Sequence, residues 1–188
     1  MSSYDSISRF NNGLAVVRRG ERSGVIDTNF NLVVDLLYDY IARYEYGLMA
    51  VRQDDMWGYM NGEGTVMIDF QFDNIWATSG VHSGMYGYIF SEGFANVVVG
   101  GKWGFIDTSG IIVIPPMFDE ARPFDGGVAA VRQDRLWGFI NARGEMISDF
   151  QFDGTSFRIY DMIRVWNEEE RATHYFNMTY GIIVRPDL

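Results

Sequence analysis

Short apolar runs bounded by glycine, aspartate and asparagine recur along the chain, and they predict β-strands joined by tight turns. In each recurrence a run of small and β-branched residues predicts a first strand. The four runs are 14–17, 48–51, 94–97 and 128–131. A second strand, such as 103–106, carries an aromatic residue beside glycine, and a third follows at 111–114. The pattern predicts a three-stranded meander or hairpin as the repeating unit.

The turn between the second and third strands has its own signature. Asp107 ends a second strand, and Gly110 follows three residues later. An Asx side chain can bond the turning backbone and glycine accepts a positive φ, so this order favours a hairpin turn. The same pairing recurs at Asn61 with Gly64 and at Asn141 with Gly144.

The unit repeats with a period of 34 residues, as the interval from Trp103 to Trp137 shows. The interval from Trp57 to Trp103 is 46 residues, so the second unit carries an insertion. Units this small cannot bury their own apolar faces and must stack on their neighbours. We therefore predict an all-β tandem array of about four to five repeats, either solenoid-like or closed as a propeller or barrel. It forms a single domain over 1–188, with repeats at about 10–43, 44–89, 90–123 and 124–157 and a degenerate C-terminal cap at 158–188.

The terminal units depart from the pattern. Ser23 stands in place of tryptophan in the first unit, and Phe30 stands in place of the turn glycine. Near the C-terminus, 162–165 predicts a first strand and 181–184 a third strand. Each regular unit closes with an aromatic residue and an aspartate, as at Asp119. We interpret these aspartates as packing and turn residues rather than calcium ligands, because a repeated ion site would need several oxygens close together.

The third unit contains Lys-Trp-Gly-Phe-Ile-Asp-Thr-Ser-Gly at 102–110, followed by Phe118 and Asp119. This motif, with Gly-apolar-Ala-x-Val before it, resembles the WG-repeat family, also called KWG repeats, and the resemblance extends from Phe10 to Asp153. Repeats of this family are mostly bacterial, occur in tandem and carry no established catalytic residue; their assumed role is interaction. The resemblance therefore implies a structural role for the repeat anchors. These anchors are Trp57, Trp103, Trp137, Gly58, Gly104 and Gly138.

Composition and charge narrow the classes of partner. With 47% hydrophobic residues the chain has ample material for a core, and its net charge of −10 repels nucleic acid and anionic membranes. A partner with strong charge is therefore expected to be basic. The chain has no cysteine and no apolar stretch long enough to span a bilayer, and we expect a cytoplasmic protein. The sequence indicates no oligomeric state.

Catalytic chemistry has little support in the residues. His82 and His174 are the only histidines and belong to no catalytic or metal motif. No phosphate loop, dinucleotide fingerprint or nucleophile elbow is present. We expect no catalytic residue, no metal and no cofactor, and we rank a hydrolase built on paired carboxylates last.

The insertion, at about 75–88, is the most informative departure from the period, because insertions in repeat arrays often emerge on the binding face. It mixes glycine with large amphipathic side chains suited to contact surfaces. Its candidate partner-binding residues are Trp76, His82, Met85, Tyr86 and Tyr88. The alternative is an extra hairpin that folds inward and covers a sheet edge. The sequence favours neither.

Together these observations favour a non-enzymatic protein–protein interaction module that binds a basic partner. An inhibitor or immunity-type protein, or an adaptor, is the concrete form of this hypothesis. The alternative is a carbohydrate or cell-envelope binder, since regularly spaced aromatic rings can stack on sugars. That alternative requires exposed tryptophans.

Overall fold

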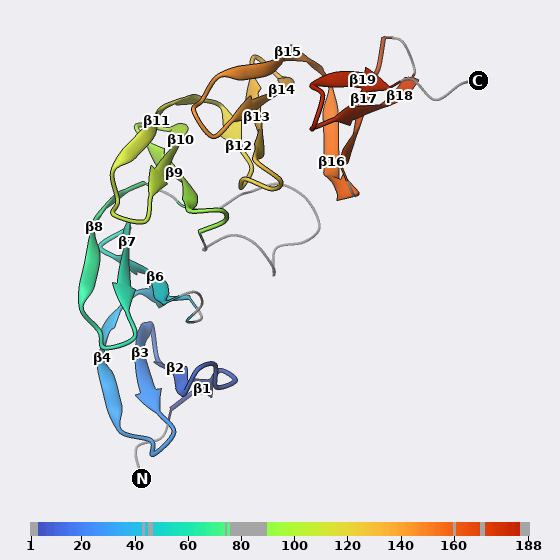
Figure 1. The fold of residues 1–188 in the computed structure, drawn as a ribbon. Coiled ribbons are helices and arrows are strands. Elements are labelled where there is room, and N and C mark those ends of the chain that lie inside the picture. The colour runs from blue at the N-terminus through green and yellow to red at the C-terminus, as the bar shows by residue number, and fades with distance from the viewer. Residues whose placement is uncertain are drawn as a thin grey trace.

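The computed structural model describes residues 4–42, 44, 47–73, 75, 90–159, 161–169 and 172–184, and every regular element within these ranges is a β-strand. The strands form five small antiparallel sheets that follow one another along the chain (Figure 1). Among these residues no helix has the length and apolar character needed to cross a membrane. The predicted all-β array is confirmed.

Each sheet is a simple meander, with neighbours in the sheet also neighbours in the chain. The first sheet contains β1 (Ser6–Ile7), β2 (Leu14–Arg19), β3 (Arg22–Asp27) and β4 (Leu32–Tyr38). The second contains β5 (Tyr40–Ile41), β6 (Leu48–Gln53), β7 (Met56–Asn61) and β8 (Val66–Phe72). The third contains β9 (Phe94–Val99), β10 (Lys102–Asp107) and β11 (Ile112–Phe118). The fourth contains β12 (Glu120–Ala121), β13 (Val128–Gln133), β14 (Leu136–Asn141) and β15 (Met146–Phe152). The fifth contains β16 (Gly154–Ile159), β17 (Met162–Asn167), β18 (Ala172–Asn177) and β19 (Ile182–Val184).

The three predicted strands of the unit are present in all five sheets, including the C-terminal one, where β17 and β19 match the predicted first and third strands. The structure adds a fourth strand before them in four sheets. It is only two residues long in β1, β5 and β12, and six residues long in β16. A single residue separates some sheets, because β4 ends at Tyr38 and β5 begins at Tyr40.

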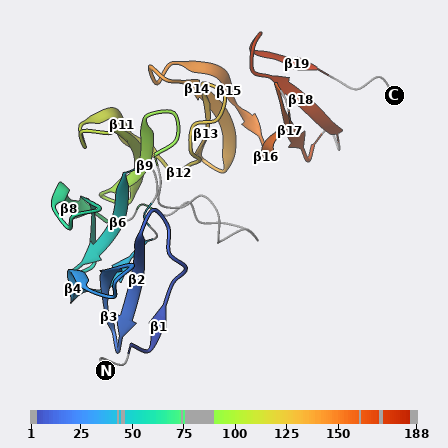
Figure 2. The ribbon, with the colours of Figure 1, turned by 60° about the horizontal axis from the view of Figure 1, so that its bottom comes forward.

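The sheets are arranged as an open arc, with the first and fifth sheets far apart (Figures 1 and 2). The last strands of the five sheets, β4, β8, β11, β15 and β19, lie on the convex side, and the short strands β1 and β12 lie toward the concave side (Figure 1). The sequence is compatible with both an open array and a closed ring. The described sheets do not close.

Most of the core lies between consecutive sheets rather than within one. Trp103 and Phe105 of the third sheet, for example, pack with Val131 and Ile140 of the fourth in one buried cluster. Similar clusters join the first and second, the second and third, and the fourth and fifth sheets. A three-stranded unit cannot stabilise itself in water, so stacking supplies the apolar burial that each sheet lacks alone.

The first unit keeps the fold despite its altered sequence. Ser23 is buried in the position of the tryptophan, and Phe30 takes a positive φ of 63° in the position of the turn glycine. At the equivalent glycines, Gly64 and Gly110, φ is 85° and 83°. The turn geometry is thus retained with a side chain that adopts it less readily than glycine does.

Candidate interaction surface

The tryptophans of the repeat are buried. Trp57, Trp103 and Trp137 are 5%, 6% and 6% exposed, and each belongs to a cluster that joins its sheet to the next. Arg122 lies over the Trp137 ring at 4.6 Å, and Arg132 approaches the same ring at 5.7 Å. Buried rings cannot stack on a sugar, so the carbohydrate alternative loses the tryptophans on which it depends.

The glycine beside each tryptophan is required by close backbone approach. At Gly104 the pairing of β10 with β11 shifts register, from Trp103 opposite Phe118 to Phe105 opposite Ile114. This bulge brings the Ile114 carbonyl oxygen within 2.6 Å of where a Cβ on Gly104 would lie. The other three units behave alike. A Cβ added to Gly24 or Gly58 would lie 2.6 Å from a backbone oxygen of the outer strand, and a Cβ added to Gly138 would lie 2.9 Å from one. A side chain therefore does not fit.

The aspartates that close the units connect a sheet to the hairpin that follows it. Asp119 accepts a hydrogen bond from the Asp134 backbone N–H at 2.9 Å, while its own N–H donates to the Arg132 carbonyl at 2.9 Å. Asp153 makes the same pair of contacts with Glu168 and Trp166 in the next unit. The interpretation of these residues as turn residues is confirmed.

Neighbouring cations reinforce two of these connections. Lys102, the only lysine of the chain, pairs with Asp119, and Arg22 pairs with Asp39 at 2.7 Å. The Lys102 contact, with the Asp134 N–H second, holds the pKa of Asp119 below its ordinary value of 3.8. These carboxylates are therefore engaged in holding the array together.

The Asx turns form as predicted. The side-chain oxygen of Asp107 accepts the backbone N–H groups of Ser109 and Ile111 at 2.9 and 3.0 Å. Asn61 and Asn141 make the equivalent pair of contacts in their units. In the first unit the N–H of Asn31 is the main cause that lowers the pKa of Asp27.

Among the described residues, the resolved pKa shifts of carboxyl groups share one direction. The carboxyl groups with a resolved pKa shift, Asp27, Asp119 and Glu145, all shift downward through hydrogen bonds. Burial raises the pKa of Tyr59, which lies inside the core. Over this part of the chain, no group of three or more His, Cys, Asp or Glu side chains could hold a metal ion.

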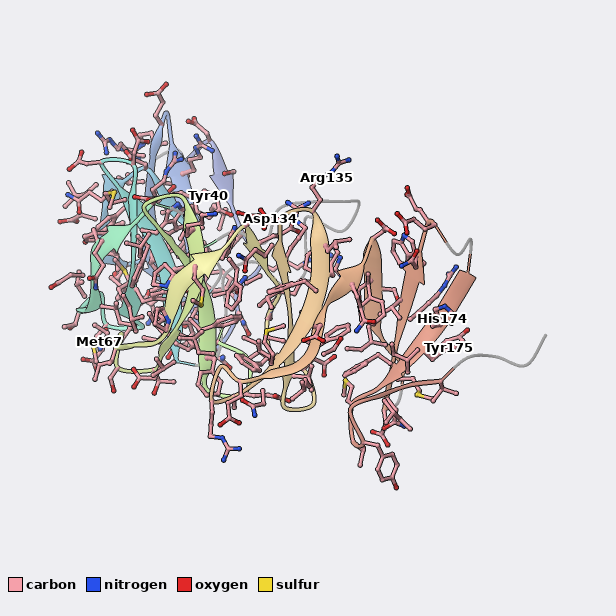
Figure 3. All side chains as sticks on the ribbon, turned by 90° about the horizontal axis from the view of Figure 1, so that it is seen from above. Tyr40, Met67, Asp134, Arg135, His174 and Tyr175 are labelled. Atoms are coloured by element: carbon pink, nitrogen blue, oxygen red, sulfur yellow. The ribbon has the colours of Figure 1, made fainter. Side chains whose placement is uncertain are left out.

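The convex side of the arc carries an unusual combination of side chains, which we call the outer-strand surface. Its apolar members are 37% to 61% exposed: Leu32, Leu37, Met67, Ile112, Val113, Met117, Met146, Ile182 and Ile183. Exposed aspartates recur at one position of the outer strands, at Asp35, Asp69 and Asp149. None of β4, β8, β11, β15 and β19 contains lysine or arginine. Figure 3 shows Met67 at the outside of its sheet.

The backbone of this surface is also open on one side, because each outer strand pairs with its sheet along a single edge. Natural sheet edges often carry charged residues or proline, which hinder pairing with a further strand. The middle of the outer strand has aspartate in β4, β8 and β15, and Pro115 with Pro116 in β11. Each of these outer strands also has a register shift in its pairing with the preceding strand, beside the three Trp-Gly pairs and Ser23-Gly24. Strand addition is therefore disfavoured, and side-chain contacts are the means of recognition left.

The sequence-predicted partner-binding residues, Trp76, His82, Met85, Tyr86 and Tyr88, lie outside the described residues, so their role stays a prediction. Sequence reasoning missed the outer-strand surface. The signal that could have found it is the recurrence of apolar residues at positions that the strand pairing turns away from the neighbouring sheet, such as Met67 and Val113.

Comparison with known families decides the affiliation. The family model described as "WG containing repeat" matches residues 3–22, 24–57, 57–80, 85–103, 103–137 and 137–169. The chain belongs to the WG-repeat family. The matches follow the tryptophan period, and they include the first unit and the C-terminal unit as far as residue 169. No curated protein matches the chain.

Solved structures of other proteins resemble the fold of this WG-repeat chain. A structure of Hsv2p from Kluyveromyces lactis is 11% identical, with a TM-score of 0.54, over 96% of this chain and 63% of that one. A crystal structure titled as the eukaryotic initiation factor is 12% identical, with a TM-score of 0.54, over 100% of this chain and 54% of that one. The chain thus spans less than two thirds of these structures. At such identities the likeness shows a propeller-like arrangement of sheets and nothing about function.

Proposed function

We propose that this WG-repeat array is a non-enzymatic protein-binding module whose partner is a basic protein. The observation that carries the proposal is the outer-strand surface, which combines exposed apolar side chains with carboxylates and has no cation in its strands. Isolated exposed apolar residues are ordinary on a protein surface, whereas a patch that recurs along the array marks an interaction site.

Charge supports the choice of partner. The whole chain carries a net charge of −10, and Asp35, Asp69 and Asp149 add local negative charge beside the apolar side chains. Such a surface accelerates encounter with a basic protein, and apolar contacts then hold the complex. An inhibitor or immunity-type protein that occludes a basic enzyme, or an adaptor, would use this combination.

A non-enzymatic role is supported by what the polar groups do. The closing aspartates and the Asx residues hold backbone N–H groups, and their resolved pKa shifts are downward. A general acid at neutral pH needs the opposite shift, which burial or a second carboxylate would produce.

The test is capture of a partner from a lysate, followed by calorimetry with the purified partner at about 50 and 200 mM salt. The variant neutralises Asp35, Asp69 and Asp149 to asparagine. The matched control changes Glu21, Glu63 and Glu169 to glutamine, which alters the net charge equally at exposed sites off the outer strands.

We expect a basic protein whose affinity falls with salt and falls further in the outer-strand variant than in the control. An equal loss of affinity in both variants would mean that net charge alone, and not the outer-strand surface, favours binding. Capture of no basic protein, together with binding on a glycan array, would favour the carbohydrate alternative instead.

A further inference from the structure

Three of the four junctions between outer strands are filled in the same way. The turn glycine of one unit lies against a buried branched side chain of the preceding outer strand. A Cβ on Gly110 would come within 2.8 Å of Ile68 Cγ2, and one on Gly64 within 2.9 Å of Val34 Cγ2. At Gly144 the nearest atom is Ile114 Cγ1, at 3.4 Å.

The fourth junction, between β15 and β19, lacks this branched side chain. Ser148 stands in β15 at the position of Val34, Ile68 and Ile114, and it is half-buried where those are buried. The turn glycine of the fifth unit, Gly181, has only the Ile147 carbonyl oxygen within 4 Å of an added Cβ, at 3.7 Å. A small residue in place of a branched one leaves space that a packed array does not close fully.

A cleft of 420 Å³ opens at this junction between β15 and the β18–β19 end of the fifth sheet. Its apolar walls include Met146, Ile147, Ile182 and Ile183, and it lies on the outer-strand surface. Its volume is within the usual range for ligand pockets. Of the four described junctions between outer strands, this one lacks the branched side chain, and the cleft lies there.

The lining also has a defined charge. Asp149 is the one ionisable group among the described lining residues, and it is exposed. Two neutral polar groups accompany it, with Gln151 Nε2 donating to Ser148 Oγ at 3.2 Å. A ligand that fits must offer an apolar group to the walls and a cation to the carboxylate.

We propose that the cleft between β15 and β19 binds an extended segment of a protein partner in which an apolar side chain is flanked by arginine or lysine. The apolar side chain takes the place of the branched residue that Ser148 replaces, and the cation pairs with Asp149. The proposal rests on the proposed function and identifies the part of the surface that recognises sequence.

The experiment uses the full ¹⁵N-labelled chain and three blocked tripeptides as probes: acetyl-Arg-Ile-Arg-amide, acetyl-Glu-Ile-Glu-amide and acetyl-Arg-Ser-Arg-amide. We expect the first to give saturable amide shifts confined to Ser148, Asp149, Ile182 and their neighbours. The other two should bind at least about tenfold more weakly, because each loses one of the two contacts. Absence of saturable shifts, or shifts spread along the other outer strands, would overturn the proposal.

Two variants separate the contacts. Ser148→Ile restores the residue type of the other three junctions, so the chain should remain folded while binding of the Arg-Ile-Arg peptide is lost. Asp149→Asn should abolish the preference for the Arg-Ile-Arg over the Glu-Ile-Glu peptide. Glu63→Gln, which removes one charge at an exposed site off the outer strands, is the control and should leave both properties unchanged.

The outcomes also distinguish the two proposals. A Ser148→Ile chain that still binds the peptide as the parent does would refute the cleft. If it also binds the purified basic partner with unchanged affinity, the proposed function stands without the cleft. If sedimentation shows instead that Ser148→Ile abolishes self-association of the parent, a second copy occupies the cleft and the peptide proposal is wrong.

Discussion

At the scale of single residues, the Trp-Gly pair requires glycine because neighbouring atoms leave no room for a Cβ, and not because of the backbone φ angle. The outer strand bulges over Gly104, and the obstructing atoms belong to backbone, the Ile114 carbonyl oxygen and the Pro116 nitrogen at 2.6 and 2.7 Å from an added Cβ. Backbone cannot move aside as a flexible side chain does. The tryptophan of the pair is replaceable, as Ser23 shows, whereas the glycine persists in Gly24.

Gly104→Ala should therefore destabilise the protein by about 2 to 3 kcal/mol, measured by urea unfolding, because the outer strand must shift to admit the methyl group. Gly93→Ala is the control for backbone conformation alone, since its φ is 87° and an added Cβ would meet nothing within 4 Å. Its cost should be about 1 kcal/mol. A Gly93→Ala cost equal to or above that of Gly104→Ala would contradict the contact argument.

Arg135 offers the opposite test. It takes a φ of 79° in the β13–β14 turn and projects from the tip of the hairpin (Figure 3), whereas the third unit has Gly101 at this position with a φ of 75°. Arg135→Gly should stabilise the protein by up to about 1 kcal/mol, because glycine adopts this conformation without steric cost. Arg143→Gly, at an exposed turn position without positive φ, should not stabilise. A drop in the thermal midpoint of Arg135→Gly would show that its side chain has contacts that outweigh the strain.

At the scale of elements, successive sheets are coupled by the closing aspartates as well as by apolar contact. Asp119 follows β11, caps the β13–β14 hairpin and pairs with Lys102 of β10, so one carboxylate connects two sheets. Because both contacts favour the charged form, this connection depends on pH.

The pKa of Asp119 is lowered in the folded chain, so its contribution is present above the ordinary value of 3.8 and is lost as pH falls through the lowered pKa. Asp119→Asn should therefore be less stable than the parent at neutral pH, and the difference should narrow below about pH 4. Urea unfolding between about pH 2 and pH 7 measures it, with Asp69→Asn as the control for charge removal on an outer strand. A difference that stays constant over this range would assign the effect to something other than ionisation.

Strand prediction from the sequence succeeds where apolar runs are long enough to show a pattern. The strands that carry 94–97, 103–106 and 111–114 are present as β9, β10 and β11. Two-residue strands such as β5 and β12 are too short to show a periodicity. They form because the end of the preceding sheet places them beside the first strand of the next hairpin, β6 or β13. Their existence is a tertiary effect that a local pattern does not contain.

At the scale of the whole molecule, the outer-strand surface depends on how sheets stack. Met67 and Ile68 are both apolar and adjacent, yet one is exposed and the other buried in the junction. The sequence predicts that both residues belong to a strand. The stacking of the sheets determines which of the two side chains faces solvent. Ser148 is different, because alignment with Val34, Ile68 and Ile114 shows the missing branched side chain directly.

An open arc also predicts how the array comes apart. Among the described residues, the fifth sheet packs on the fourth through the cluster of Trp137, Phe139 and Phe176, and the Phe139 and Phe176 rings stack at 4.5 Å. In a linear array a weakened junction releases the sheets beyond it, whereas a ring would hold them from both sides.

Trp137→Ala should cost about 3 to 5 kcal/mol at this junction. Hydrogen exchange under native conditions should then show loss of protection in β16 to β19, while β2 to β8 keep theirs. Met60→Ala is the mirrored control, because Met60 is fully buried between the first and second sheets and its loss should release β1 to β4 instead. Uniform loss of protection in both variants would mean that the five sheets unfold as one cooperative unit, and the linear description of the array would be wrong.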